Sequence, residues 1–186
     1  FDYVTINVSS PNTKNLRDLQ KPETLEKILQ NVNTINVSLK RKVPIFIKIA
    51  PDLSNSNVTE ILSVCEENNV SGLIATNTTI NPKNLKNSNS FEGGLSGKPL
   101  FNQSNKILRL LAKRKNASTV LIGVGGIFSA SDIYEKIMLG ASAVQIYTGF
   151  VYNGPMHIKR MEMELKNLLL SDGYNSIDGA VGALIR

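Results

Sequence analysis

Five short apolar runs, rich in β-branched residues, recur along the chain, and each ends at a polar or glycine-rich segment. This pattern predicts five strands, at residues 3–8, 43–50, 72–76, 120–124 and 143–147. The runs are apolar almost throughout instead of alternating with polar residues. Such strands are typical of a parallel sheet that is covered by helices.

Apolar residues recur at helical spacing between these strands. The first helix begins near Pro22, and the others are predicted at residues 57–68, 102–113, 131–139 and 156–170. Ser129 or Ser131 can cap the fourth helix, and Gly140 can end it. Strand and helix therefore alternate, which requires crossover connections between parallel strands.

The position of the glycines distinguishes a barrel from an open sheet. An open dinucleotide-binding sheet has its glycine-rich turn after the first strand, whereas here Gly125 and Gly126 follow the fourth. We therefore predict an α/β fold of the (β/α)8 TIM-barrel class, incomplete and covering about the last five strand-helix units. Residues 1–186 would be a single partial domain.

Composition excludes several classes of protein. Hydrophobic residues make up 41% and charged residues 19% of the chain, as in ordinary globular proteins, and no apolar stretch is long enough to span a membrane. One cysteine and one histidine cannot form a zinc site, so we expect no metal, and Cys65 fits a small buried helix residue. The net charge of +6 is scattered and aromatic residues are only 6%, so we expect no nucleic-acid partner.

The glycines after the fourth strand are a candidate anion site. Consecutive glycines allow backbone N–H groups to approach a phosphate closely, and the next helix adds a favourable dipole. Gly125 and Gly126 alone also fit a tight strand-to-helix turn. Tyr147, Thr148 and Gly149 at the next strand end favour the phosphate-binding interpretation.

Polar groups at the second and third strand ends fit an aromatic ligand. Lys48 lies in an otherwise apolar strand, where a charge is unfavourable without an anion or an electron-rich ring opposite it. A lysine that reaches out to solvent is the alternative. Thr76, Asn77 and Thr78 supply amide and hydroxyl groups that suit a planar ligand with carbonyl and N–H groups.

The first strand ends in serine and asparagine side chains, without an acid, histidine or cysteine. Ser10 lies between Asn7 and Asn12, next to Pro11. A serine is a weak base in water, so a catalytic Ser10 needs a desolvated site and an acidified substrate proton.

In order along the chain, the strand ends resemble the motifs of the quinone-linked class 2 dihydroorotate dehydrogenases. The similarity covers the carboxyl-terminal part of that family and runs from Asp2 to the end of the chain. The motifs are Asn7-Val8-Ser9-Ser10-Pro11-Asn12-Thr13, Lys48-Ile49-Ala50-Pro51-Asp52-Leu53, Thr76-Asn77-Thr78-Thr79, Gly93-Gly94-Leu95-Ser96-Gly97-Lys98-Pro99-Leu100, Gly123-Val124-Gly125-Gly126 and Gln145-Ile146-Tyr147-Thr148-Gly149.

The resemblance implies an FMN-dependent enzyme of pyrimidine (UMP) biosynthesis that oxidises dihydroorotate to orotate and reduces a membrane quinone. It implies that Ser10 is the general base that removes the C5 proton while hydride leaves for flavin N5. The implied substrate contacts are Asn7, Asn12, Asn77 and Thr78. The implied FMN contacts are Asn7, Lys48, Thr76, Gly97, Gly126, Tyr147 and Thr148.

The resemblance also implies that other parts of the family's barrel have no counterpart here. These are three of eight strands, the substrate-binding Lys and Asn residues on them, and the amino-terminal helices that form the quinone tunnel and the membrane attachment. We therefore expect a membrane-associated protein, at the cytoplasmic side of a bacterial inner membrane or at the mitochondrial inner membrane. We also expect residues 1–186 alone to have exposed sheet edges and little or no turnover.

Two alternatives stay open at this point. One is another FMN barrel, of the dihydropyrimidine dehydrogenase or tRNA-dihydrouridine synthase type, but those relatives use a catalytic cysteine and Cys65 is on a predicted helix. The other is a non-catalytic fragment that only binds phosphate.

Overall fold

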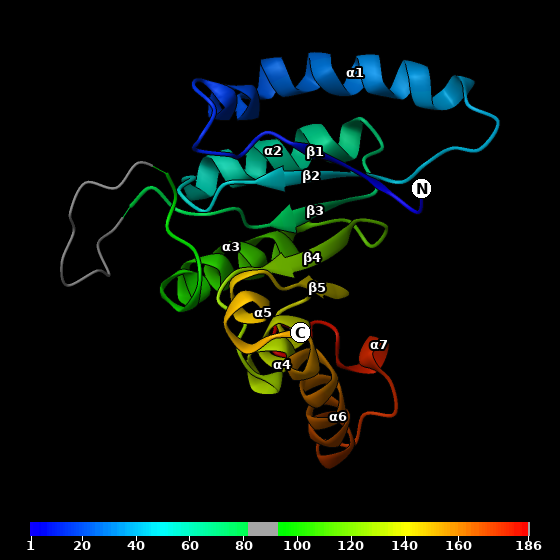
Figure 1. The fold of residues 1–186 in the computed structure, drawn as a ribbon. Coiled ribbons are helices and arrows are strands. Elements are labelled where there is room, and N and C mark those ends of the chain that lie inside the picture. The colour runs from blue at the N-terminus through cyan, green and yellow to red at the C-terminus, as the bar shows by residue number, and fades with distance from the viewer. Residues whose placement is uncertain (82–92, 186) are drawn as a thin grey trace.

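The computed structural model describes residues 1–81 and 93–185, and five parallel strands form its one sheet (Figure 1). The strands lie side by side in chain order, as the sequence predicts. They are β1 (Val4–Asn7), β2 (Ile45–Ile49), β3 (Gly72–Ala75), β4 (Val120–Val124) and β5 (Ala143–Gln145). A parallel sheet in which each strand pairs with the next is the arrangement of a barrel segment, and here the barrel is incomplete.

At least one helix follows each strand, and the long helices form close to the positions that the sequence predicts. The long helices are α1 (Pro22–Ser38), α2 (Asn55–Glu67), α3 (Phe101–Arg114), α4 (Ala130–Met138) and α6 (Pro155–Ser171). The Ser54 side chain accepts a hydrogen bond from Asn57 N, so α2 begins before residue 57. Ser129 caps α4 in the same way by accepting from Asp132 N.

Four short helical segments were not predicted. They are η1 (Leu16–Gln20), η2 (Lys98–Leu100), α5 (Thr148–Asn153) and α7 (Ile177–Ala180). The predicted fifth strand was too long, because β5 stops at Gln145 and the chain turns into α5 at Thr148. The polar segment at 81–94 lies largely outside the described residues.

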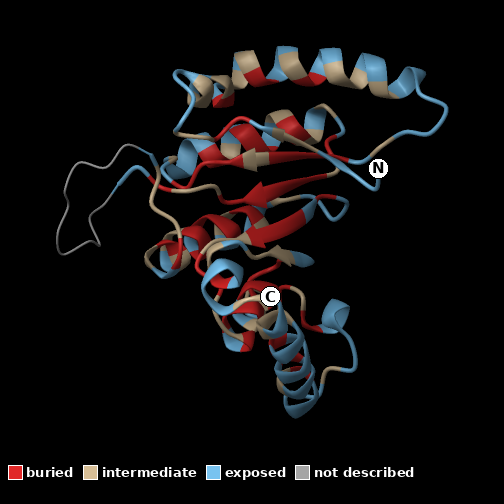
Figure 2. Cartoon of the chain, in the orientation of Figure 1, coloured by how far each residue is buried: buried red, intermediate tan, exposed pale blue. Residues whose placement is uncertain are grey.

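The larger apolar core lies between the sheet and α1, α2 and α3. Alternate residues of the central strands, such as Ile47 and Leu73, pack against Leu29, Ile61 and Leu108 of these helices. Figure 2 shows the buried residues along the strands and on the helix sides that face them. Cys65 belongs to this core, which confirms the prediction of a buried helix residue.

The opposite face of the sheet carries a much smaller apolar cluster. Phe46, Ile74 and Ile122 are buried there, with Val124 packed against them. Lys48 follows Phe46 by two residues and therefore points to this same face, where it is half-buried. The face of the sheet opposite α1, α2 and α3 therefore combines a small apolar cluster with the Lys48 side chain.

Among the described residues, no helix combines the length and the apolar character that crossing a bilayer requires.

Candidate functional site

The register of the sheet places the polar ends of neighbouring strands side by side. Asn7 of β1 is the register partner of Lys48 in β2. Just beyond β3, Thr76 N donates to Val124 O at 3.0 Å and Asn77 N donates to Ile49 O at 2.8 Å. The ends of β1 to β4 therefore meet at one edge of the sheet.

A cavity of about 260 Å³ opens at this edge. It is lined by residues from strand ends far apart in the sequence. Eight of the predicted site residues are among them: Lys48, Thr76, Asn77, Thr78, Gly97, Gly126, Tyr147 and Thr148. Their assigned contacts with ligand remain predictions.

The other predicted residues, Asn7, Ser10 and Asn12, do not line this cavity. They lie beside it at the end of β1. Asn7 connects the two groups, because Asn77 Nδ2 donates to Asn7 Oδ1 at 3.3 Å.

One end of the cavity is built from backbone. Gly125 and Gly126 have φ angles of 116° and 75°, which glycine adopts without strain. In the described part of the chain, the N–H groups of both glycines donate to no other protein atom. A Cβ at Gly126 would lie 2.5 Å from Phe101 Cβ, so α3 fixes how closely this turn packs.

The first turn of α4 is already capped by protein groups. Phe128 N donates to Asp132 Oδ2 at 2.9 Å, and Asp132 forms an ion pair with Lys98 at 3.0 Å. Burial opposes ionisation of Asp132, but the hydrogen bonds from Phe128 N, Lys98 and Ser129 outweigh it and lower its pKa. Ser129 and Asp132 therefore satisfy backbone N–H groups at the start of α4, and the N–H groups of Gly125 and Gly126 stay available to an anion in the cavity.

Lys48 places a cation in the wall of the cavity. Among the described residues it takes part in no ion pair. Burial lowers its pKa below the ordinary value for lysine. An anionic or electron-rich ligand beside it would favour the charged form.

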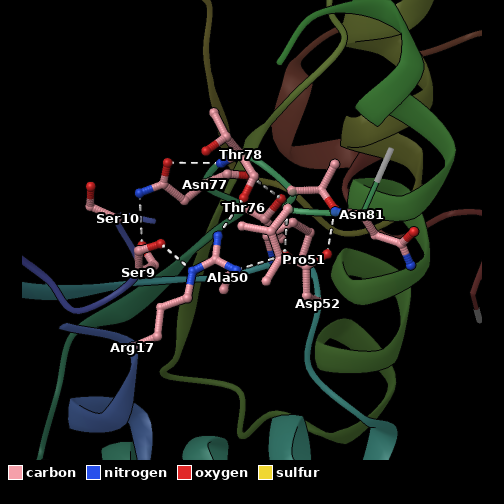
Figure 3. A network of polar contacts seen from close by, with 12 residues as sticks. Ser9, Ser10, Arg17, Ala50, Pro51, Asp52, Thr76, Asn77, Thr78 and Asn81 are labelled. Atoms are coloured by element: carbon pink, nitrogen blue, oxygen red, sulfur yellow. Dashed lines mark hydrogen bonds and ion pairs between the residues drawn. The ribbon is translucent and has the colours of Figure 1, made fainter. Parts of the chain in front are cut away.

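Ser9, which sequence reasoning did not select, joins the β1 and β3 ends (Figure 3). Its side chain is fully buried, donates to Asn7 Oδ1 at 2.8 Å and accepts from Asn77 Nδ2 at 3.0 Å. Asn77 Oδ1 in turn accepts from Thr78 N at 2.8 Å. Only the contacts distinguish Ser9 from its neighbour Ser10, since the two are the same residue type.

Ser10 is half-buried and lies outside this buried network. Its Oγ accepts a hydrogen bond from Asn12 N at 3.3 Å. Figure 3 shows its hydroxyl directed away from Ser9 and Arg17. The Ser10 side chain is therefore available to a ligand that binds above Asn7 and Asn77.

Arg17 and Asp52 are further residues that sequence reasoning did not assign to the site. Arg17 Nη1 donates to Asp52 Oδ2 at 2.8 Å, and the guanidinium also reaches the backbone at the ends of β1 and β3. Asp52 accepts from Ile80 N at 3.1 Å and from the Thr79 hydroxyl. No spacing rule marks Arg17, which is one of many dispersed basic residues.

The family model and the curated relatives that match this chain point to the same family. The family model for dihydroorotate dehydrogenase matches residues 1–169. The chain is 46% identical over 182 residues to a dihydroorotate dehydrogenase (quinone) of Cereibacter sphaeroides, covering 97% of this chain and 51% of that protein. It is 43% identical to the protein of the same name in Myxococcus xanthus, covering 98% of this chain and 50% of that protein.

Solved structures that resemble this chain belong to the same family. A ligand-free DHODH from Eimeria tenella superposes with a TM-score of 0.94 at 37% identity, covering all of this chain and 56% of that one. The complex of the Eimeria tenella enzyme with ferulenol gives a TM-score of 0.92 at 36% identity, with 98% and 54% of the two chains covered. The chain spans about half the length of the curated relatives it matches. On this sequence and structural similarity, residues 1–186 belong to the dihydroorotate dehydrogenase family.

Proposed function

We propose that the protein containing this chain oxidises dihydroorotate to orotate in pyrimidine biosynthesis, with FMN as cofactor and a quinone as electron acceptor. The observation that carries the proposal is the gathering of Lys48, Thr76, Gly126 and Thr148 around one cavity in a member of this family. We further propose that residues 1–186 are the carboxyl-terminal part of one barrel domain.

The cavity suits FMN at both ends. The N–H groups of Gly125 and Gly126 would hold the phosphate, together with Tyr147 and Thr148. Gly97 and Thr76 would contact the flavin, and the Lys48 ammonium would lie where reduced flavin gathers negative charge. When bound, FMN supplies the acceptor for the substrate hydride.

Ser10 is the proposed general base for the substrate C5 proton. Donation from Asn12 N to Ser10 Oγ favours the deprotonated form of the hydroxyl. A half-buried position limits the competition from water.

Asn7, Asn12, Asn77 and Thr78 are the proposed substrate contacts. The Asn7 Oδ1 atom is occupied by Ser9, which leaves its Nδ2 for a substrate carbonyl or carboxylate. Asn77 Nδ2 makes a longer bond, 3.3 Å, to Asn7 Oδ1, and this bond would exchange for a substrate oxygen.

The proposed acceptor places the enzyme at a membrane, because quinones reside in the bilayer. Attachment would come from a part of the protein outside residues 1–186, at a bacterial inner membrane, on its cytoplasmic side, or at a mitochondrial inner membrane. We also propose that residues 1–186 alone give little or no turnover, since the family's other substrate-binding residues are on the remaining strands.

The position of Cys65 disfavours the flavin barrels that use a catalytic cysteine. Cys65 is buried in α2, within the core and away from the strand ends. Burial, with a smaller effect of Glu66, raises the pKa of its thiol to about 12. Such a thiol is poorly suited to acid-base work near neutral pH.

The test compares Ser10→Ala with Cys65→Ala in the full-length protein. The wild-type protein should be yellow and should bleach when dihydroorotate is added without oxygen. We expect Ser10→Ala to slow this bleaching by about 10² to 10⁴-fold, the usual contribution of a general base, and Cys65→Ala to leave the rate per flavin unchanged.

A colourless protein, or a yellow one that dihydroorotate does not bleach, would refute the proposed function. Equal bleaching rates in the two variants would remove Ser10 from the role of base and leave the redox function in place.

A further inference from the structure

The Arg17 guanidinium joins three strand ends. Arg17 Nε donates to Ser9 O at 3.0 Å, beyond β1. Arg17 Nη2 donates to Thr78 O at 2.8 Å, beyond β3. The third contact is with Asp52, beyond β2 (Figure 3).

Both backbone acceptors belong to peptide groups next to proposed active-site residues. The Ser9 carbonyl is part of the peptide bond to Ser10, and the Thr78 carbonyl is one peptide beyond Asn77. Ser9 is 8 residues from Arg17 in the sequence, whereas Thr78 is 61 residues from it. Arg17 therefore ties the peptide group before Ser10 to the Asn77–Thr78 segment, in addition to the hydrogen bond from Asn77 to Ser9.

Asp52 holds the guanidinium in this orientation. The Arg17 and Asp52 side chains are only 20% and 17% exposed, unlike the solvated pair Lys21–Asp18 at 65% and 57%. The Asp52 carboxylate also accepts from Ile80 N and from Gln103 Nε2 at 3.2 Å. Groups from the segment after β3 and from α3 thus hold the Asp52 carboxylate toward Arg17, so the ion pair is preorganised.

We propose that Arg17 is a positioning residue that sets the distance between Ser10 and the Asn77–Thr78 pair. This inference rests on the proposed dihydroorotate oxidation. Arg17 itself touches backbone and carboxylate, so it acts through the groups that it holds. Its planar fork makes three divergent hydrogen bonds at once, which a lysine ammonium on a flexible stem cannot reproduce in the same geometry.

The experiment separates the two half-reactions of the full-length protein. We expect Arg17→Lys to slow flavin reduction by dihydroorotate about 10 to 100-fold, because small misplacements of reacting groups have effects of this size. Reoxidation of the flavin by a soluble quinone should stay within about twofold of wild type, since it does not use Ser10. Asp52→Asn should give a smaller loss, because Arg17 can still donate to both carbonyls.

Arg114→Lys is the matched control. Arg114 Nη1 donates to Thr59 Oγ1 at 3.2 Å on the exposed side of α2 and α3, so the same exchange there tests the chemistry of the substitution alone. Its reduction and reoxidation rates should both equal those of wild type.

The outcomes are distinguishable. If wild type does not turn over dihydroorotate, the proposed function fails. If wild type is active and Arg17→Lys reduces its flavin at the wild-type rate, or loses reduction and reoxidation equally, the positioning role fails while the proposed function stands.

Discussion

Lys136 is a lysine of α4 that the fold buries completely, against Gly123 of β4. Its exposed fraction is 0%, and its Nζ donates to Asn105 Oδ1 at 2.6 Å and to Ser104 Oγ at 3.0 Å. The ammonium also lies 5.1 Å from the Phe101 ring centroid. The Ser104 hydroxyl in turn donates to Val124 O, so Lys136 supports the end of β4.

This burial predicts a pH-dependent stability. Burial lowers the pKa of Lys136 to about 8 from 10.5, although Glu135 and Asp132 act in the opposite direction. Between these two values the unfolded chain binds more protons than the folded one, so the contribution of Lys136 to the free energy of unfolding rises with pH. Below about pH 8 both states are protonated and the cost of burying the charge is fully present. The predicted gain across the window is on the order of 3 kcal/mol at most.

Urea unfolding of the full-length protein at pH 7.5, 8.5 and 9.5 checks this prediction. Wild type should gain stability relative to Lys136→Met as pH rises, whereas the exposed Lys106→Met should follow wild type. The raised pKa of Cys65 makes the free energy of unfolding fall as pH rises. Cys65 is present in wild type and in Lys136→Met, so this effect cancels when the two are compared. Parallel curves for wild type and Lys136→Met would contradict the account.

The sequence alone reveals the special environment of some basic residues but not of others. Lys48 is conspicuous because it interrupts an apolar strand, and it does line the cavity. Lys136 and Arg17 sit in amphipathic or polar segments, where a basic residue is normally solvated. Their burial depends on what packs against them, α3 for one and three strand ends for the other, and no local pattern reports those contacts.

At the scale of elements, the β4–α4 turn is the part of the site that depends most on backbone conformation. We expect Gly126→Ala in the full-length protein to weaken FMN binding at least tenfold. A methyl group there meets α3 at Phe101 and is strained at a φ of 75°. The measurement is the dissociation constant of FMN, from fluorescence of the released flavin.

Gly173→Ala is the control for backbone strain alone. Gly173 has a φ of 82°, and nothing lies within 4 Å of the position its Cβ would take. It should lose a similar amount of conformational free energy, about 1 kcal/mol, and bind FMN as wild type does. Equal affinities in the two variants would show that the turn does not shape the flavin site.

Long periodic elements were predictable and short ones were not. α1 and α3 present repeating apolar positions over several turns, and β2 and β3 are continuous apolar runs. α5 has six residues, which are too few for a periodic pattern, so the sequence does not predict this helix. η1 was missed for the same reason, although it carries Arg17.

At the scale of the whole molecule, the sheet has two open edges. Within the described residues, β1 pairs only with β2, and β5 only with β4. The sequence motifs allowed the barrel to be recognised, because strand-helix alternation and late glycines are features of that class. The convergence of the strand ends depends on the parallel register of the entire sheet, which the sequence does not display.

The central claim is that Ser10, Lys48, Asn77 and Gly126 serve one flavin and one substrate. The most direct test is a crystal structure of the full-length protein with FMN and orotate. We predict that the phosphate accepts from Gly126 N–H, that Lys48 and Thr76 contact the flavin ring, and that Ser10 faces orotate held by Asn77. A flavin bound elsewhere, or Ser10 and Gly126 directed to separate ligands, would contradict the account.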